Sequence, residues 1–415
     1  MKNKTLLILL LSLFIHSTFA QTKLPVGTWR GILKNATGNN LPFNFIVSDT
    51  GSSQQLTVIN GDERLKVTDV KFVGDSVFIK MPLFDSEFKL QLAVTGDGKN
   101  YLSGKWIKHL GIKDATMDFI AESGAGWRFF KDGAAPAYNI SGRWSAIFGD
   151  DGAKKDTTVG EFKQEGTKLT GTFLTTTGDY RYLEGTVAGD SVYLSCFDGG
   201  HAFIFTAKIN ADNTLTNGKF YAGYSGIDHW AAVRDENAKL PDAYSLTYLK
   251  PGYKTIDFTF KDINGKPVSL SDARFKGKVV IVQILGSWCP NCMDETRFFT
   301  SGYYEQYHAK GVEIIGLAYE RTTDFAKSQH TLQQLKTHFN IPYPLLITGY
   351  TPSSGDPQKS LPMLADFKGF PTTIIIDKKG EVRKIHTGFS GPGTGDYYTQ
   401  FVTEFDKLTD DLLAE

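Results

Sequence analysis

The sequence Gly286-Ser287-Trp288-Cys289-Pro290-Asn291-Cys292 carries two cysteines that are separated by two residues. An apolar run typical of a buried strand, residues 279–285, precedes this motif, and a helix-compatible segment, residues 293–307, follows it. Cys289 is therefore expected at the N-terminus of a helix, where free backbone N–H groups and the helix dipole favour a thiolate. At such positions the pKa of a cysteine falls from about 8.5 to between about 3.5 and 7.5. The spacing predicts a pair that forms and reopens one disulfide.

Half of a zinc site is the other reading of two close cysteines, but the chain has three cysteines in all, and the third is Cys196. No second pair of Cys or His residues accompanies the motif, so we predict redox chemistry, with no metal and no cofactor. Cys196 lies in an alternating, strand-like run and is expected to be a buried apolar residue. A redox role for Cys196 is the alternative.

Length and composition limit the remaining possibilities. The chain has 415 residues, which suggests two or three domains, and it is 41% hydrophobic and 22% charged, as is typical of folded proteins. Lys plus Arg and Asp plus Glu number 45 each, so no net charge attracts nucleic acid or anionic lipid. We expect no nucleic-acid partner.

The N-terminus has the pattern of an export signal. Lys2 and Lys4 precede an apolar run, residues 6–15, and small residues up to Ala20 would suit cleavage. We predict a signal peptide at residues 1–20 and an exported, soluble protein of the bacterial periplasm. Because no cysteine lies near the cleavage position, lipid anchoring is not expected.

The first half of the chain shows almost no helical periodicity. Between residues 24 and 234, short alternating runs such as Phe43-Asn44-Phe45-Ile46-Val47 recur between turn dipeptides such as Asn60-Gly61. These patterns predict antiparallel strands joined by hairpins.

This all-β region also repeats itself. Gly27-Thr28-Trp29 corresponds to Gly142-Arg143-Trp144, 115 residues later, and Gly74-Asp75-Ser76-Val77 recurs at the same offset as Gly189-Asp190-Ser191-Val192. Further matches in the same order predict two copies of one β unit.

We place the two copies at residues 21–122 and 139–234. The Gly-x-Trp at the start of each copy resembles the opening of lipocalin-like up-and-down barrels. A pair of β-sandwiches is the alternative. The modules are interpreted as docking or spacing units, although a barrel could also bind a small apolar ligand.

From residue 251 to residue 415, strands alternate with helices, which predicts an α/β domain. Five motifs occur there in the order found in thioredoxin-like exported disulfide reductases, and the region resembles the TlpA/ResA group. The motifs are Asp257-Phe258, Asn264-Gly265-Lys266-Pro267-Val268-Ser269-Leu270, Gly277-Lys278-Val279-Val280, Trp288-Cys289-Pro290-Asn291-Cys292 and Gly369-Phe370-Pro371-Thr372-Thr373.

The resemblance implies a thioredoxin-like fold and a reversible Cys289–Cys292 disulfide that acts on disulfides of other exported proteins. It also implies a cis peptide bond before Pro371, which would lie against the cysteine pair. Trp288, Pro290, Phe370 and Pro371 are then expected to form the substrate-binding surface. A membrane electron donor would re-reduce the pair.

Glu295 is the predicted proton acceptor of Cys292. The buried Asp of cytosolic thioredoxin would fall at Gln283, which cannot titrate. Glu295 follows Cys292 by three residues, a spacing that places side chains on one face of a helix. A surface glutamate is the alternative.

Two other functions compete with disulfide reduction. A thiol peroxidase shares the fold, but its Pro-x-x-x-Thr-x-x-Cys setting is not present before Cys289. A ligand- or partner-binding β protein with an accessory redox domain is the non-enzymatic alternative.

Overall fold

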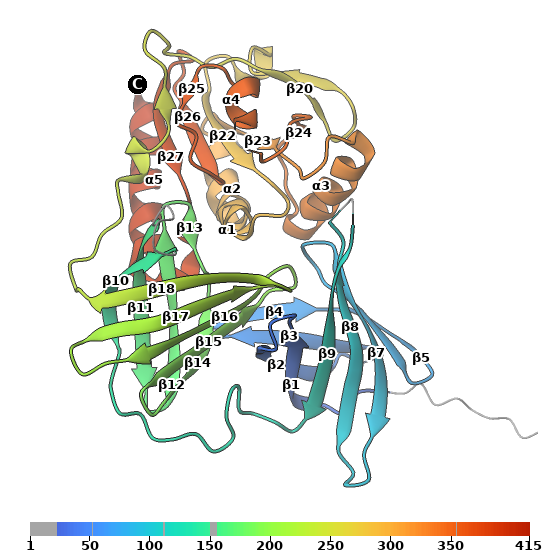
Figure 1. Ribbon diagram of the computed structural model, residues 1–415. Coiled ribbons are helices and arrows are strands. Elements are labelled where there is room, and N and C mark those ends of the chain that lie inside the picture. Colours follow the sequence, from blue (N-terminus) through green and yellow to red (C-terminus); the bar gives the residue numbers. More distant parts are fainter. Residues whose placement is uncertain (1–22, 52, 111–112, 150–155, 354) are drawn as a thin grey trace, which may run out of the picture.

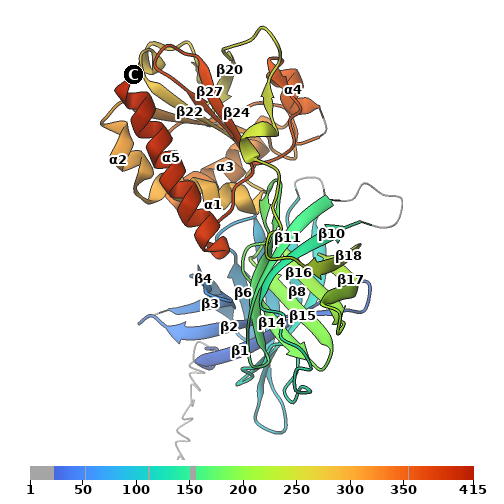
Figure 2. The same ribbon diagram turned by 90° about the vertical axis from the view of Figure 1, so that its left-hand side faces the viewer.

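The computed structural model describes residues 23–51, 53–110, 113–149, 156–353 and 355–415. Two β modules lie side by side, and an α/β domain rests across them (Figures 1 and 2). Within the described residues, no helix combines the length and apolarity needed to span a membrane. The predicted signal peptide, residues 1–20, lies outside the described residues.

The first β module is a nine-stranded antiparallel meander in the order β4-β3-β2-β1-β9-β8-β7-β6-β5. Pairing of β1 with β9 brings its two ends together, while β4 and β5 are the two edges of the sheet, so the barrel is split there. Its strands are β1 (Gly27–Lys34), β2 (Asn40–Asp49), β3 (Gln54–Asn60), β4 (Glu63–Val67), β5 (Asp69–Val73), β6 (Ser76–Lys80), β7 (Ser86–Val94), β8 (Asn100–Lys108) and β9 (Ala115–Ser123).

The second β module has the same meander order but is closed. Here β12 pairs with both β11 and β14, and β10 pairs with β18, so hydrogen bonding continues around the barrel. Its strands are β10 (Gly142–Phe148), β11 (Asp156–Glu165), β12 (Lys168–Thr175), β13 (Gly178–Asp179), β14 (Leu183–Ala188), β15 (Ser191–Phe197), β16 (Ala202–Ile209), β17 (Thr214–Ala222) and β18 (Gly226–Arg234). The predicted duplicated, barrel-like region is confirmed.

The tryptophans of the two Gly-x-Trp motifs have equivalent surroundings. Trp29 and Trp144 are 0% and 1% exposed. Each indole N–H donates a hydrogen bond of 2.9 Å to the carbonyl four residues upstream, Pro25 and Ile140 respectively. A buried indole needs such a partner, so each tryptophan fastens the segment that enters its barrel.

The second module fills the split of the first. Phe197, at the end of β15, stacks on Phe43 of β2 with ring centroids 4.4 Å apart. Arg128, from the segment between the modules, is buried and donates to Ser195 Oγ (2.8 Å) and Asn60 Oδ1 (3.0 Å). The core of the first module retains a cavity of about 20 Å³. That space is close to the minimum for one water molecule and does not suit the small apolar ligand considered above.

The α/β domain has a seven-stranded sheet in the order β21-β20-β24-β23-β22-β26-β27, in which β22 runs parallel to β23 and antiparallel to β26. This is the predicted thioredoxin-like arrangement. Its strands are β20 (Thr259–Asp262), β21 (Pro267–Ser269), β22 (Val279–Leu285), β23 (Val312–Ala318), β24 (Leu345–Ile347), β26 (Thr372–Ile376) and β27 (Val382–Thr387), and its α-helices are α1 (Pro290–Phe298), α2 (Tyr304–His308), α3 (Phe325–Phe339), α4 (Asp356–Ser360) and α5 (Asp396–Ala414). A two-stranded ribbon, β19 (Tyr248–Leu249) with β25 (Leu364–Ala365), lies beside it.

Helix boundaries follow local chemistry. Helix α3 begins where the Asp324 side chain accepts from the Lys327 N–H (3.0 Å), and it ends where Asn340 adopts a left-handed conformation with φ of 50°. The helix expected after the cysteine motif begins earlier, at Pro290, and is interrupted where Ser301 and Gly302 leave helical angles. Helix α4 is a short helix of five residues, with Pro357 near its start and Gly355 in a left-handed conformation directly before it.

Candidate active site

The two cysteines lie where β22 passes into α1. Cys289 caps the helix, Pro290 is its first residue, and the Cys292 N–H donates to Cys289 Sγ at 3.2 Å. The cysteines form a disulfide with their Cα atoms 5.3 Å apart. Cys289 is 4% exposed and Cys292 is fully buried. A thiolate formed at Cys289 would face the positive end of the helix, as the sequence indicated.

The segment around Pro371 lies against this motif. The Phe370–Pro371 peptide bond is cis, and Pro371 is buried directly before β26. Thr372, the first residue of β26, is paired with Ile284 of β22, which brings the two loops together. The Phe370 ring packs edge-on against Trp288, with ring centroids 5.4 Å apart. The residues predicted to receive substrate thus gather around the disulfide.

Glu295 is buried beneath the motif rather than at the surface. On β22 and β26, Gln283 and Thr373 are register partners, and both side chains reach the carboxyl group. Gln283 Nε2 donates to Oε2 (2.9 Å), and Thr373 Oγ1 donates to Oε1 (2.6 Å). Burial raises the pKa of Glu295 to about 7. The same Gln283 amide lies 3.5 Å from the Cys292 carbonyl oxygen, so it links the carboxyl group to the backbone of the second cysteine.

Glu320 is a site residue that was not predicted from the sequence. It follows β23, and its carboxylate accepts from the Ser287 N–H (2.8 Å) and the Ser287 hydroxyl (2.6 Å). Burial raises the pKa of Glu320, and Arg321 beside it stacks on the Trp288 ring at 4.9 Å. The position of Glu320 just after β23 could have indicated it, because β23 runs parallel to β22 and the carboxyl ends of adjacent parallel strands lie at the same edge of the sheet.

Cys196 takes no part in the site. It is a free thiol, 1% exposed, inside the core of the second module, and burial raises its pKa well above the usual range. We expect alkylation of the native, reduced chain by iodoacetamide to modify Cys289, with Cys196 protected by about 100-fold or more until the chain is unfolded. Peptide mass spectrometry checks this. A Cys196→Ser chain should lose only the label that depends on denaturation, and rapid native labelling of Cys196 would contradict the assignment.

The comparisons with known proteins concern this same region. A model of the Redoxin family matches residues 250–400. Thiol-disulfide oxidoreductase ResA of Bacillus subtilis (strain 168) is 26% identical over 140 residues, covering 34% of this chain and 69% of the relative. ResA of Bacillus thuringiensis subsp. konkukian (strain 97-27) is 31% identical over 134 residues, covering 32% of this chain and 68% of the relative. The chain belongs to the ResA family of thiol-disulfide oxidoreductases.

Membership in the ResA family rests on the C-terminal third of the chain, where the predicted motifs lie. Among solved structures, the thioredoxin domain of a thiol-disulfide oxidoreductase from Bacteroides vulgatus is 23% identical. That match covers 37% of this chain and 99% of the other, with a TM-score of 0.27. The predicted enzyme class, thiol-disulfide oxidoreductase, is confirmed by the ResA relatives. The duplicated β modules lie outside the matched residues.

Proposed function

We propose that this ResA-family chain is an exported disulfide reductase that acts on disulfides of other exported proteins. The observation that supports this most strongly is the disulfide at the N-terminus of α1, with a titratable carboxyl group buried behind it. Residues 251–415 would carry the redox chemistry, and residues 21–122 and 139–234 would control access to it. The region before residue 21 would be removed on export.

The proposed reaction is a two-electron thiol–disulfide exchange. The Cys289 thiolate attacks a substrate disulfide and releases the first substrate thiolate, which takes a proton from solvent. Cys292 passes its proton to Glu295 and attacks Cys289, which closes the Cys289–Cys292 bond and releases the second substrate thiolate, which takes a proton from solvent. A buried carboxyl group with a pKa of about 7 is matched to this proton transfer at neutral pH. A membrane electron donor would then reopen the bond.

The direction of electron flow is tested by the reduction potential of the pair together with the reaction of the reduced chain with oxidised glutathione. A reductant should have a potential towards about −270 mV, the value of thioredoxin, and its dithiol form should reduce oxidised glutathione. A potential near about −120 mV would make the protein an oxidant and contradict the proposed direction. Export is tested separately by the N-terminal sequence of the mature chain, which should begin at Gln21.

A further inference from the structure

The cysteine motif is covered by a segment of the second β module. This segment, residues 175–181, connects β12 through β13 towards β14. With its amide oriented to satisfy both polar atoms, the Asn291 side chain donates to the Asp179 carbonyl (3.0 Å) and accepts from its N–H (3.2 Å). The Asp179 carboxyl group accepts from the Gly391 N–H at 2.7 Å. A motif residue and a loop of the redox domain are therefore both held by the 175–181 segment.

The same segment packs closely against the glycines on either side of the Pro371 strand. A methyl group added to Gly369 would lie 2.5 Å from Thr177 Cγ2, and one added to Gly388 would lie 2.7 Å from the Thr176 carbonyl oxygen. Gly388 in turn donates its N–H to the Pro371 carbonyl at 2.8 Å. Only glycine permits an approach this close. The backbone surface around the cis proline is thus occupied by the chain itself.

Arg181 anchors the 175–181 segment of the second β module to both the redox domain and the first β module. Its guanidinium group pairs with Asp294 on α1 and with Glu63 of the first β module, both at 2.5 Å, and reaches the Pro290 carbonyl oxygen at 3.4 Å. The Arg181 side chain is 9% exposed, and those of Asp294 and Glu63 are 5% and 9% exposed. Removing one member of a buried ion pair leaves an uncompensated charge, so the docked arrangement depends strongly on Arg181.

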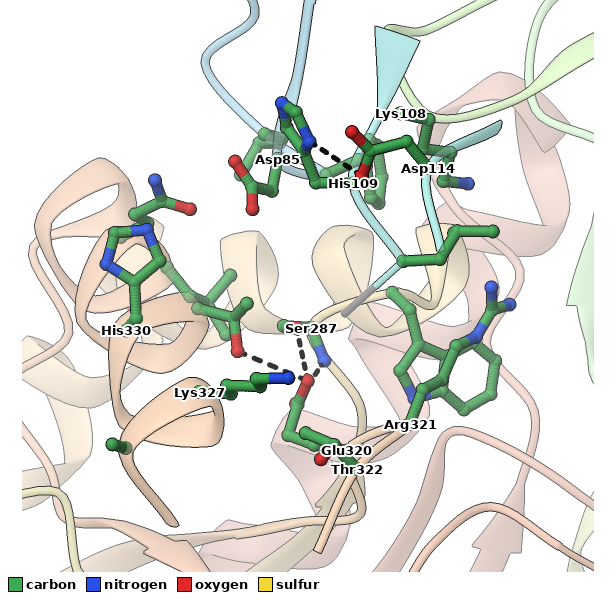
Figure 3. Close-up of a pocket in the computed structure, with 18 of the residues that line it drawn as sticks. Asp85, Lys108, His109, Asp114, Ser287, Glu320, Arg321, Thr322, Lys327 and His330 are labelled. Carbon is green, nitrogen blue, oxygen red and sulfur yellow. Dashed lines mark hydrogen bonds and ion pairs between the residues drawn. The ribbon is translucent and has the colours of Figure 1, made fainter. Parts of the chain in front are cut away.

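The motif borders open space at Trp288, although neither cysteine lines that space. A cavity of about 820 Å³ lies there between the first β module and the redox domain (Figure 3). Its lining includes Phe84 and Lys108 from the module, with Trp288 and Arg321 from the redox domain. A second hollow, of about 570 Å³, is lined by no residue of the 286–292 motif among those that the structure describes. The first cavity is of the size that holds small ligands or a few residues of an extended chain.

We infer that residues 175–181 make the enzyme selective for disulfides on small molecules or thin, extended segments, which enter beside Trp288, and exclude disulfides on compact proteins. This inference rests on the proposed function, because it names the substrates that the same cysteine pair accepts. Each turnover reduces one substrate disulfide to two thiols and oxidises the Cys289–Cys292 dithiol to its disulfide, so electrons and protons balance.

The test compares two substrates in single-turnover reactions of the reduced, full-length chain. Oxidised glutathione serves as the small disulfide and folded insulin as the compact protein. Arg181→Ala should raise the ratio of the insulin rate to the glutathione rate by about tenfold or more, because it releases the covering segment. Thr177→Phe places a larger side chain against Gly369, which should displace the 175–181 segment and raise the same ratio. This second variant keeps the test valid if Arg181→Ala does not fold. Circular dichroism identifies the folded variants.

Lys163→Ala is the matched control, since this lysine of the second module has a side chain that is 75% exposed and pairs with Glu165 at the surface. Its ratio should equal that of the wild type. A ratio that stays at the wild-type value in every folded variant overturns the inference. Failure of the wild type to react with oxidised glutathione would instead contradict the proposed function, so the two failures are distinguishable.

Discussion

Replacing Cys289 with serine is expected to lower the rate of disulfide exchange by at least about a thousandfold, because the nucleophile itself is lost. Replacing Cys292 with serine should leave the first attack intact and block its resolution. The Cys292→Ser chain should therefore accumulate a mixed disulfide between Cys289 and the substrate. Intact-mass measurement after reaction with oxidised glutathione checks this, since the adduct adds one glutathionyl group.

The positions of the two sulfur atoms explain this asymmetry. Cys289 caps α1 and is the more exposed of the two, whereas Cys292 lies one turn further into the helix and is fully buried. A Cys196→Ser chain is the control and should exchange at the wild-type rate. An adduct on Cys292 in the Cys289→Ser chain, formed as fast as the wild-type reaction, would show that the roles of the two cysteines are reversed.

Much of the redox domain could be predicted from local patterns. The apolar run at residues 312–318 coincides with β23, and the stripe of apolar residues in the C-terminal segment forms α5. Such elements are encoded by periodicity and by nearby capping residues, which a single sequence displays. The cysteine motif could also be recognised from the sequence, because its chemistry depends on residues that are close together in the chain.

The control of the motif could not be predicted, because it depends on contacts over long separations. Arg181 meets Asp294 only when the second barrel docks on the redox domain, and Glu63 joins them from the first barrel. Their separation in sequence exceeds one hundred residues in each case. The split of the first barrel could not be predicted for the same reason, because Phe197 of the second module packs into it. The sequence of one repeat does not show which segment of another module will pack against it.

Replacing Glu295 with glutamine is expected to slow the resolving step by about a hundredfold, the usual contribution of a positioned proton acceptor. Glutamine preserves the side-chain size and can still pair with Gln283 and Thr373, so the change removes titration rather than packing. In the wild type, the resolving rate should rise as the pH increases through about 7, where Glu295 loses its proton. In the variant that rise should move towards about 8.5, the ordinary pKa of a thiol. Stopped-flow measurement of mixed-disulfide decay against pH checks both effects.

The Glu295→Gln chain should become more stable at pH 8 although its resolving step becomes slower. This combination separates a role in proton transfer from a purely structural role. Burial raises the pKa of Glu295 from 4.5 to about 7, so the folded chain favours the protonated form. That contribution to the free energy of unfolding is complete below about 4.5 and is lost as the pH rises through about 7. At pH 8 the glutamine variant should therefore be more stable than the wild type, by up to about 3 kcal/mol.

Urea unfolding at pH 5 and at pH 8 measures this difference, with Glu305→Gln on the exposed side of α2 as the control. A residue that merely supported the fold would lose stability and activity together when replaced. Glu295→Gln should instead lose resolving rate while gaining stability at pH 8. An unchanged pH profile of the resolving step would remove Glu295 from the reaction and leave Cys292 to exchange its proton with solvent.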